Sequence, residues 1–428
     1  MLKLFKKAPL YSLVIVLALV LAFNTAQATE ITFWSGETEE ERQAVIRDIV
    51  EEFEEEYPEI EVEIVPVHES DLPDQLTAAM AADTLPALVE LGLEHVMLLS
   101  ELDLLDSETA ELAIENIGRD DYFSSPIEMT SIEGENLAVP MHGWVQAIWY
   151  RQDWFDEAGI DSPEDWETIE EAAEYFNDPP ETYGFITGTG ATHYTRQGFN
   201  QFAFSNEAYM FDEEGNIAFD SPEMVETMEF YKSLDEYAPP GPQDHRDARS
   251  LYMADQLGML VYSTFFMGTL DEGAPELIED TGFAPRMVNE EEAVYGQFQS
   301  LGVTDTASEE EKEAARKLIE FMMTDDQYID YLHMAPAGML PVRGSVAEDP
   351  NYRDHELLEV FGEQLDDIID SLEVADGFGF EHDQIHPELG PITAQFVIGS
   401  EIAEMLDQDR SPEEVVRRIN EWMEDIVE

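Results

Sequence analysis

The stretch EITFWSGETEEERQAVIRDIVEEFEEEYPEIEVEI, residues 30–64, decides the fold class of this chain. Residues 30–34 are predicted to form a strand that ends at the turn Ser35-Gly36, and residues 60–64 alternate polar and apolar side chains like a second strand. Between them, apolar side chains recur at helical spacing until Pro58 ends the helix. A strand, a helix and a strand in this order predict a parallel pair joined by a right-handed crossover. The helical apolar positions are Ile46, Ile49, Val50, Phe53 and Tyr57.

Predicted helices and strands alternate over the remainder of the chain, which indicates an α/β architecture. The length favours two domains, because one hydrophobic core rarely serves so many residues. Three Ser-Pro-Glu triplets, at 162–164, 221–223 and 411–413, predict helix starts, since serine caps a helix and proline is favoured at its first position. Residues 212–216 are predicted to form a turn and not a calcium loop, because they lack the alternating spacing of calcium ligands.

Residues 1–28 have the composition of a secretory signal peptide. Three lysines at positions 3, 6 and 7 precede an apolar run over residues 10–23 and the small-residue motif Ala26-Gln27-Ala28. The alternative, an uncleaved membrane anchor, requires that motif to be accidental. The chain contains no cysteine, so neither a disulfide nor a cysteine-linked lipid anchor is possible. We therefore expect a mature protein that begins at Thr29, is not lipidated and is retained in a periplasm.

The chain is extremely acidic, with 97 Asp and Glu against 20 Lys and Arg and a net charge of −77. Removal of the three signal lysines brings the mature net charge to −80. No basic footprint for nucleic acid survives. Because 44% of the residues are hydrophobic and the acids are spread along the chain, they predict a solvated surface and not a disordered tail. Their repulsion is screened at molar salt, where the Debye length falls to about 3 Å, so we predict a halophilic protein.

Sequence motifs of common enzymes are absent: there is no P-loop, Gly-x-Gly-x-x-Gly, His-Glu-x-x-His or Gly-x-Ser-x-Gly. His382 and His386 have the spacing of two metal ligands on a helix, but Gly377, Gly379 and Pro387 favour a loop there. A carboxylate pair for glycoside hydrolysis stays open, because among 97 acids no pair stands out. We therefore expect no enzyme activity, no cofactor and no metal.

Five segments carry a resemblance to a known family. They are residues 31–36 with the following helix, 76–90, 138–155, 314–324 and 338–343. In this order they resemble the family 1 extracellular solute-binding proteins, which include the maltose-binding protein and other sugar receptors of ABC importers. The resemblance implies an α/β, type II periplasmic-binding-protein fold, with two α/β lobes and a ligand cleft between them.

The resemblance also implies lobe boundaries, a mechanism and partners. Residues 29–141 and 302–341 would form the N-lobe, residues 142–301 and 342–428 the C-lobe, and residues 137–140 and 297–302 the hinge strands. The protein would be a monomer that captures a mono- or oligosaccharide by lobe closure and passes it to ABC permease subunits. Another polar solute, such as glycerol phosphate or a polyamine, a chemosensory role and a secreted glycoside hydrolase remain as alternatives.

Ligand-binding residues are expected where aromatic side chains stand beside carboxylate, imidazole or guanidinium groups, because sugars present flat apolar faces and rims of hydroxyls. Three of these residues have a structural alternative to ligand contact. Trp34 could fill a lobe core, Glu37 could be an acid at the start of a helix, and Arg343 could form a local salt bridge. Tyr194 and Arg196 are expected in a loop. By the resemblance, the candidates are Trp34, Glu37, Glu94, His95, Trp144, Tyr194, Arg196, Tyr262, Phe265 and Arg343.

Overall fold

The computed structural model describes residues 28–68, 71–132, 134–362 and 364–427 of the 428-residue chain. The predicted signal peptide, apart from Ala28, lies outside these residues. Within the described part of the chain, no helix combines the length and apolarity needed to cross a membrane.

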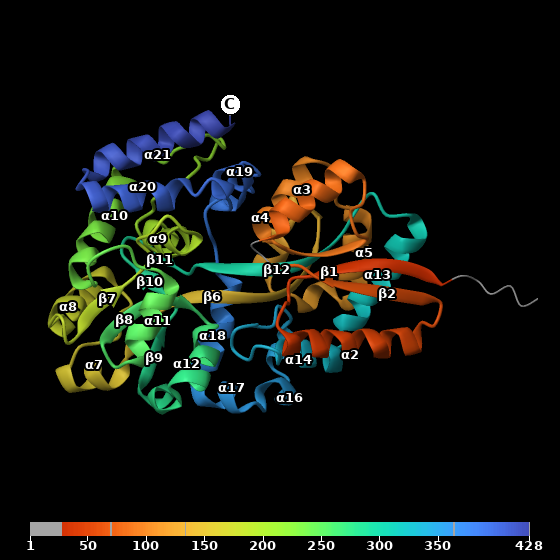
Figure 1. The fold of residues 1–428 in the computed structure, drawn as a ribbon, viewed down its shortest axis with the longest axis horizontal. Helices are drawn as coiled ribbons and strands as arrows, with labels where there is room; N and C mark the ends of the chain where they lie inside the picture. The colour runs from red at the N-terminus through yellow and green to blue at the C-terminus, as the bar shows by residue number, and fades with distance from the viewer. Residues whose placement is uncertain (1–27, 69–70, 133, 363, 428) are drawn as a thin grey trace, which may run out of the picture.

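The predicted strand–helix–strand unit at the start of the chain is confirmed. Strand β1 (Thr29–Ser35) lies parallel to β2 (Ile60–Pro66), and α2 (Glu40–Glu56) connects them. The helix buries Ile46, Ile49, Val50 and Phe53, four of the five apolar positions that its spacing selects, and the fifth, Tyr57, is its half-buried C-cap residue. The helix thereby covers one face of the sheet beside β1 and β2 (Figure 1).

One mixed sheet runs through the whole molecule in the order β2-β1-β3-β12-β6-β8-β7, and β9 also pairs with β6. Figure 1 shows two α/β lobes, with β6 and β12 running between them. Strand β6 has 13 residues, so its first part pairs with β12 and its last part pairs with β8 and β9 in the other lobe. The remaining strands of this sheet are β3 (Leu88–Gly92), β6 (Val139–Arg151), β7 (Tyr183–Ile186), β8 (Leu257–Ser263), β9 (Thr281–Ala284) and β12 (Gly296–Val303).

Helices cover both faces of each lobe (Figure 1). Around the lobe that contains β1, these are α3 (Leu72–Ala82), α4 (Leu93–Glu101), α5 (Ser107–Ile117), α6 (Ser124–Met129), α13 (Glu309–Met322) and α14 (Asp325–Leu332). Around the lobe that contains β8, they are α7 (Gln152–Ala158), α8 (Trp166–Phe176), α9 (His193–Ser205), α10 (Pro222–Leu234), α11 (His245–Met253) and α12 (Phe266–Gly273).

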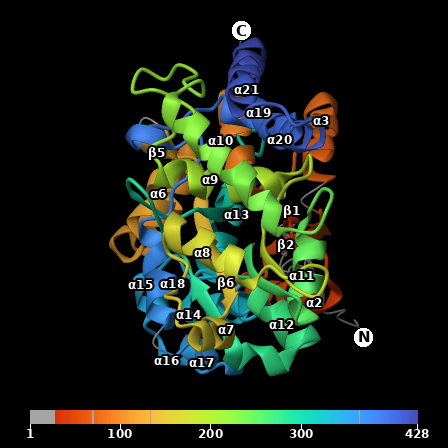
Figure 2. The same ribbon diagram turned by 90° about the vertical axis from the view of Figure 1, so that its left-hand side faces the viewer.

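The C-terminal segment, residues 344–427, returns to both lobes. It contains α15 (Gly344–Ala347), α16 (Pro350–Arg353), α17 (Glu356–Phe361), α18 (Gln364–Glu373), α19 (Leu389–Ala394), α20 (Val397–Gln408) and α21 (Pro412–Val427). Helices α20 and α21 pack on each other, and α21 also packs on α10, at the end of the molecule seen at the top of Figure 2. Helix α19 instead packs against α4 of the other lobe. The C-terminal segment therefore joins the two lobes on one side.

Two of the three predicted helix starts are confirmed. Ser221 caps α10 by accepting a hydrogen bond from Met224 N, and Ser411 accepts one from Glu414 N at the start of α21. The prediction at Ser162 is wrong: α8 begins at Trp166, and Asp165 caps it by accepting from Thr168 N. Asp165 lies directly before the apolar stripe of the helix, so its carboxylate reaches the free backbone amides that Ser162 does not reach.

The predicted turn at residues 212–216 is also confirmed. Asp212 accepts hydrogen bonds from Glu214 N and Asn216 N, and the residues on either side, Phe211 and Ile217, pair as an isolated antiparallel bridge. The carboxylate of Asp212 thus stabilises the turn by accepting hydrogen bonds from backbone N–H groups within it.

Candidate functional site

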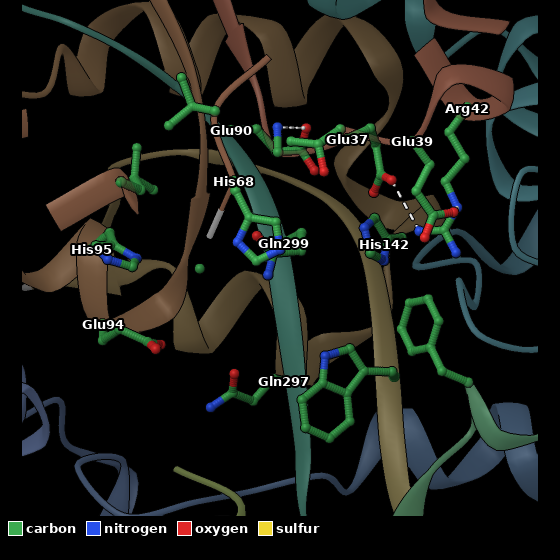
Figure 3. A pocket seen from close by; sticks show the side chains of 17 residues that line it. Glu37, Glu39, Arg42, His68, Glu90, Glu94, His95, His142, Gln297 and Gln299 are labelled. Atoms are coloured by element: carbon green, nitrogen blue, oxygen red, sulfur yellow. Dashed lines mark hydrogen bonds and ion pairs between the residues drawn. The ribbon is translucent and has the colours of Figure 1, made fainter. Parts of the chain in front are cut away.

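A cavity of about 280 Å³ opens between the two lobes beside the crossing strands. Most of its lining comes from the lobe that contains β1 (Figure 3). Phe265 comes from the segment between β8 and α12. The lining residues are Gly36, Glu37, Thr38, Glu39, Arg42, Val67, His68, Leu72, Glu90, Gly92, Glu94, His95, His142, Trp144, Phe265, Gln297 and Gln299.

The floor of the cavity is one face of three neighbouring strands. Alternate residues of a strand point to the same face, so Gln297 and Gln299 share a face of β12, and His142 and Trp144 share a face of β6. The register places Gln299 beside His142 and Gln297 beside Trp144. On its other side, Gln299 pairs with Gly92 of β3, two residues after Glu90. The middle of the sheet thus presents a row of polar side chains where its two lobes meet.

Glu90 is the most deeply held carboxylate of the floor, with 5% of its surface exposed. Its two oxygens accept hydrogen bonds from the backbone N–H of Gly36 at 2.9 Å, from Ser35 Oγ at 3.2 Å and from Tyr331 Oη at 3.3 Å. Burial, and secondly the negative charge of Glu37, raise the pKa of Glu90 to about 7. Glu90 is therefore able to hold a proton near neutral pH while its position stays fixed.

Arg42 on α2 forms one wall of the cavity. Its guanidinium pairs with Glu37 at 3.0 Å and with Glu39 at 3.3 Å. The same group lies 5.9 Å from the centre of the Phe265 ring, at a distance where a cation is attracted to an aromatic face. Since Phe265 belongs to the other lobe, this contact spans the cleft.

Glu94 and His95, in the first turn of α4, form the opposite wall. Burial alone would raise the pKa of Glu94, but the charges of His95 and of Arg196 hold it below its ordinary value. Arg196 lies on α9 of the other lobe, and its Nε is buried without a hydrogen bond. A positive charge of the other lobe therefore acts on Glu94 at this side of the cleft.

The structure places five of the ten predicted residues in the cavity lining and five outside it. Those in the lining are Glu37, Glu94, His95, Trp144 and Phe265. Those outside the lining are Trp34, Tyr194, Arg196, Tyr262 and Arg343.

The residues outside the lining have other surroundings. Tyr194 and Arg196 lie on helix α9, so the expected loop is wrong, and Tyr194 Oη donates to the carbonyl of Val261 at 2.7 Å. Trp34 is half-buried against the hydrophobic core, which is the alternative that its strand position leaves open. Tyr262 lies against the guanidinium of Arg249, 5.8 Å from its ring centre.

Arg343 occupies a salt-bridge network away from the cavity. Its guanidinium pairs with Asp121 at 2.8 Å and with Asp325 at 3.1 Å, and it donates to the carbonyl of Met323 at 2.6 Å. Arg343 thus forms the local salt bridge that is the alternative to ligand contact, and it does not line the cleft.

Four residues of the floor are not among those predicted from the sequence: Glu90, His142, Gln297 and Gln299. The signal is present in two short runs. In LVELG, residues 88–92, a glutamate stands in an otherwise apolar strand. In GQFQSLG, residues 296–302, glutamines alternate with other residues in a strand that has a neighbouring strand on each side. Polar side chains at alternate positions of a buried strand indicate a lined cavity.

Among the described residues, no group of three or more histidine, aspartate or glutamate side chains has the arrangement of a metal site. The predicted non-helical course around His382 and His386 is confirmed, since only a short 3-10 turn (Glu381–Asp383) interrupts the loop. His386 stacks on Phe211 with ring centres 4.1 Å apart, and His382 Nε2 lies 3.2 Å from the Phe211 carbonyl. Both rings therefore serve to pack the loop.

Comparison with known proteins gives a consistent result. The family model described as bacterial extracellular solute-binding protein matches residues 36–329. YcjN of Escherichia coli (strain K12), provisionally assigned as an ABC transporter periplasmic-binding protein, is 31% identical over 375 residues, which cover 86% of each chain. The maltose-bound MalE3 of T. maritima superimposes with a TM-score of 0.76 at 23% identity, covering 93% of this chain and all of that one. A solute-binding protein of Agrobacterium radiobacter K84 in complex with ribitol gives a TM-score of 0.77 at 19% identity, covering 94% and 99%.

Proposed function

This chain belongs to the bacterial extracellular solute-binding proteins, and on that premise we propose that it captures a sugar or a polyol in the cavity between its lobes for an ABC importer. The observation that carries the proposal is the make-up of the cavity. Trp144 and Phe265 offer apolar ring faces, while carboxylates, imidazoles and carboxamides surround them. Sugars and polyols need this combination, because each has apolar C–H surface and a rim of hydroxyls.

The charge and the size of the cavity narrow the ligand class. Glu37, Glu39, Glu90 and Glu94 line it, and the positive charge of Arg42 is already paired with two of them. An anion such as glycerol phosphate would meet this negative surface and is disfavoured. A volume of about 280 Å³ lies at the small end of ligand sites, which favours a short sugar or a linear polyol over a long oligosaccharide.

A polyamine is the second candidate, because the same four carboxylates would attract a cationic chain. A sugar binds through stacking on aromatic rings and through hydrogen bonds that it both donates and accepts. A polyamine needs neither the ring-stacking surface nor an equal number of donors and acceptors in its site. A ligand screen that includes both classes separates the two.

The mechanism that we propose is capture by lobe closure without covalent chemistry. Residues 29–141 and 302–341 form the N-lobe and residues 142–301 and 342–428 form the C-lobe, with β6 and β12 absorbing the rotation. In favour of this division, these strands are the ones that pair within both halves of the sheet. The closed form is selected because only there does the ligand touch both lobes, with Glu37, Glu94 and His95 on one side and Trp144 and Phe265 on the other. Arg196, whose charge acts on Glu94 from the other lobe, would join them on closure.

Membership of an extracellular solute-binding family of ABC importers implies a periplasmic location. We propose further that residues 1–28 are removed on export, that the mature protein is a non-lipidated monomer without enzymatic activity, and that it works at high salt. The composition supports these points: there is no cysteine for a lipid anchor, and the net charge of −77 needs screening.

A thermal-shift screen in molar KCl tests the proposal. Maltose, ribitol, D-mannitol, D-arabinose, spermidine and glycerol 3-phosphate are each added at millimolar concentration. A ligand at a hundred times its Kd stabilises the folded protein by about 2.7 kcal/mol, so binding raises Tm measurably. We expect a shift with at least one neutral sugar or polyol. A shift with spermidine alone would support the second candidate, and no shift with any neutral compound of a widened sugar and polyol set would contradict the proposal.

A further inference from the structure

His142 lies at the floor of the cavity, and neither of its ring nitrogens makes a hydrogen bond of normal geometry. The residue is 2% exposed, and both nitrogens are almost completely enclosed. The nearest aromatic neighbour is Tyr331, whose ring centre is 5.8 Å away and tilted by 47°. The backbone of Gly143 lies close enough to act on the ring as a hydrogen-bonding group and raise its pKa, but its geometry falls outside that of a normal hydrogen bond. A buried polar group in this state is destabilising until it finds a partner.

The surroundings keep the imidazole uncharged. Burial, and secondly the positive charge of Arg42, lower the pKa of His142 to about 3. At any pH between 5 and 8, one nitrogen therefore carries a hydrogen and donates, while the other accepts. A protonated ring, with two donors and no acceptor, does not form in this range.

The neighbours of His142 on the floor are also groups that donate and accept. Gln299 lies beside it in the register of β6 and β12, and its carboxamide contributes both an N–H₂ and a carbonyl. Trp144, on the same face of β6, supplies an apolar ring. The part of the floor around His142 is thus built from uncharged side chains, in a protein with 97 acidic residues.

Resting on the proposed function, we propose that His142 determines ligand specificity, because its donor and acceptor nitrogens together require a ligand hydroxyl and so select neutral polyhydroxyl compounds. A hydroxyl group both donates and accepts, so a pair of hydroxyls satisfies both nitrogens in either tautomer. A phosphate oxygen only accepts and a protonated amine only donates, so each leaves one nitrogen without a partner. Because both nitrogens are enclosed in the unliganded protein, the proposal requires the ring to rotate toward the cavity when a ligand hydroxyl bonds to it.

The test compares His142→Phe with wild type and with Tyr352→Phe. Phenylalanine keeps a ring beside Tyr331 and removes both nitrogens. Tyr352 is a matched control, since its hydroxyl is also buried without a hydrogen bond but lies outside the cavity lining. Affinity for the neutral compound that shifts wild type most, out of ribitol, D-mannitol, maltose and D-arabinose, is measured by calorimetry in molar KCl, together with the Tm of the unliganded protein.

The expected result has opposite signs in the two readouts. His142→Phe lowers affinity at least tenfold while its unliganded Tm is equal to or higher than that of wild type, because an unsatisfied buried group is removed. Tyr352→Phe leaves affinity unchanged. His142→Gln, which keeps a donor and an acceptor, retains affinity within about threefold of wild type. If His142→Phe does not fold, a tenfold loss in His142→Leu together with retention in His142→Gln supports the same conclusion.

A second readout addresses selectivity. Wild type should prefer D-mannitol over spermidine by a larger factor than His142→Phe does, because spermidine has no hydroxyl and its protonated amines only donate. Unchanged affinity for the neutral ligand in His142→Phe would overturn this inference and leave the proposed function standing. Failure of wild type to bind any neutral sugar or polyol would instead contradict the proposed function itself, and the inference with it.

Discussion

Glu381 is predicted to make the stability of the protein depend on pH. The residue lies in the loop between α18 and α19 and is completely buried. One of its oxygens accepts from Met210 N at 2.9 Å and the other from Gly379 N at 2.7 Å. Burial nevertheless raises the pKa of Glu381 to about 8, and the nearby charge of Asp376 adds to the effect. Near neutral pH the folded protein therefore holds a proton that the unfolded chain releases.

The direction and the size of the effect follow from this difference. Because the folded state binds the extra proton between about pH 4.5 and pH 8, stability falls as pH rises through this window. At 1.36 kcal/mol for each pH unit, the loss amounts to at most about 5 kcal/mol. Glu381→Gln removes the titration but has one acceptor oxygen for two N–H groups, which costs about 1 kcal/mol at every pH.

Urea unfolding of wild type and Glu381→Gln at pH 5, 7 and 9 in molar KCl measures the difference. The variant should be about 1 kcal/mol less stable than wild type at pH 5 and about 3 kcal/mol more stable at pH 9. Glu373→Gln is the control, because Glu373 is an exposed glutamate at the end of α18, the helix that precedes the loop of Glu381. A difference between wild type and Glu381→Gln that stays constant from pH 5 to pH 9 would refute the reasoning.

Three further predictions concern salt, the Arg343 network and the cavity aromatics. Tm should rise when KCl is increased from 10 mM to 2 M, because the net charge of −77 is then screened; a Tm that does not rise would contradict a halophilic protein. Arg343→Met should lower the free energy of unfolding by about 2 kcal/mol, since the carbonyl of Met323 loses its donor and Asp121 keeps only its hydrogen bonds from Ser345, yet leave ligand affinity unchanged, as denaturation and calorimetry would show. Trp144→Ala should weaken binding of the best neutral ligand about tenfold with little change in Tm, while Trp34→Ala should leave affinity intact; equal affinities of Trp144→Ala and wild type would remove Trp144 from the site.

Local patterns in the sequence are sufficient to predict much of the fold. The unit over residues 29–66 is predictable because its strand alternation, helical spacing and Pro58 all indicate the same structure. The helix starts at Ser221 and Ser411 are equally local. Ser162 misleads because the helix begins only after Asp165, three residues later, whose carboxylate caps it.

The candidate site is less predictable, because it is assembled from segments far apart in the chain. The loop that follows β1, the first turn of α4, strand β6 and strand β12 contribute to one cavity. Glu37 and Glu94 can be found because they follow strands at the edge of the cleft. His142 and Gln299 become neighbours only through a strand register that joins residues more than 150 positions apart, which no local pattern reveals.

Arg343 and Tyr194 show the converse. Each has a side chain suited to a ligand, but the fold gives it a partner elsewhere: Asp121 and Asp325 for Arg343, and the carbonyl of Val261 for Tyr194. Whether a polar side chain is committed to a structural partner depends on tertiary contacts and not on residue type.

A crystal structure of the protein with its best neutral ligand, grown at high salt, tests the proposed function most directly. We predict one sugar or polyol in the cavity between the lobes, with apolar C–H surface against Trp144 or Phe265 and hydroxyls within hydrogen-bonding distance of Glu94 and His142. A ligand bound outside this cavity, or one held in it without contact to residues of both lobes, would contradict capture by lobe closure at this site.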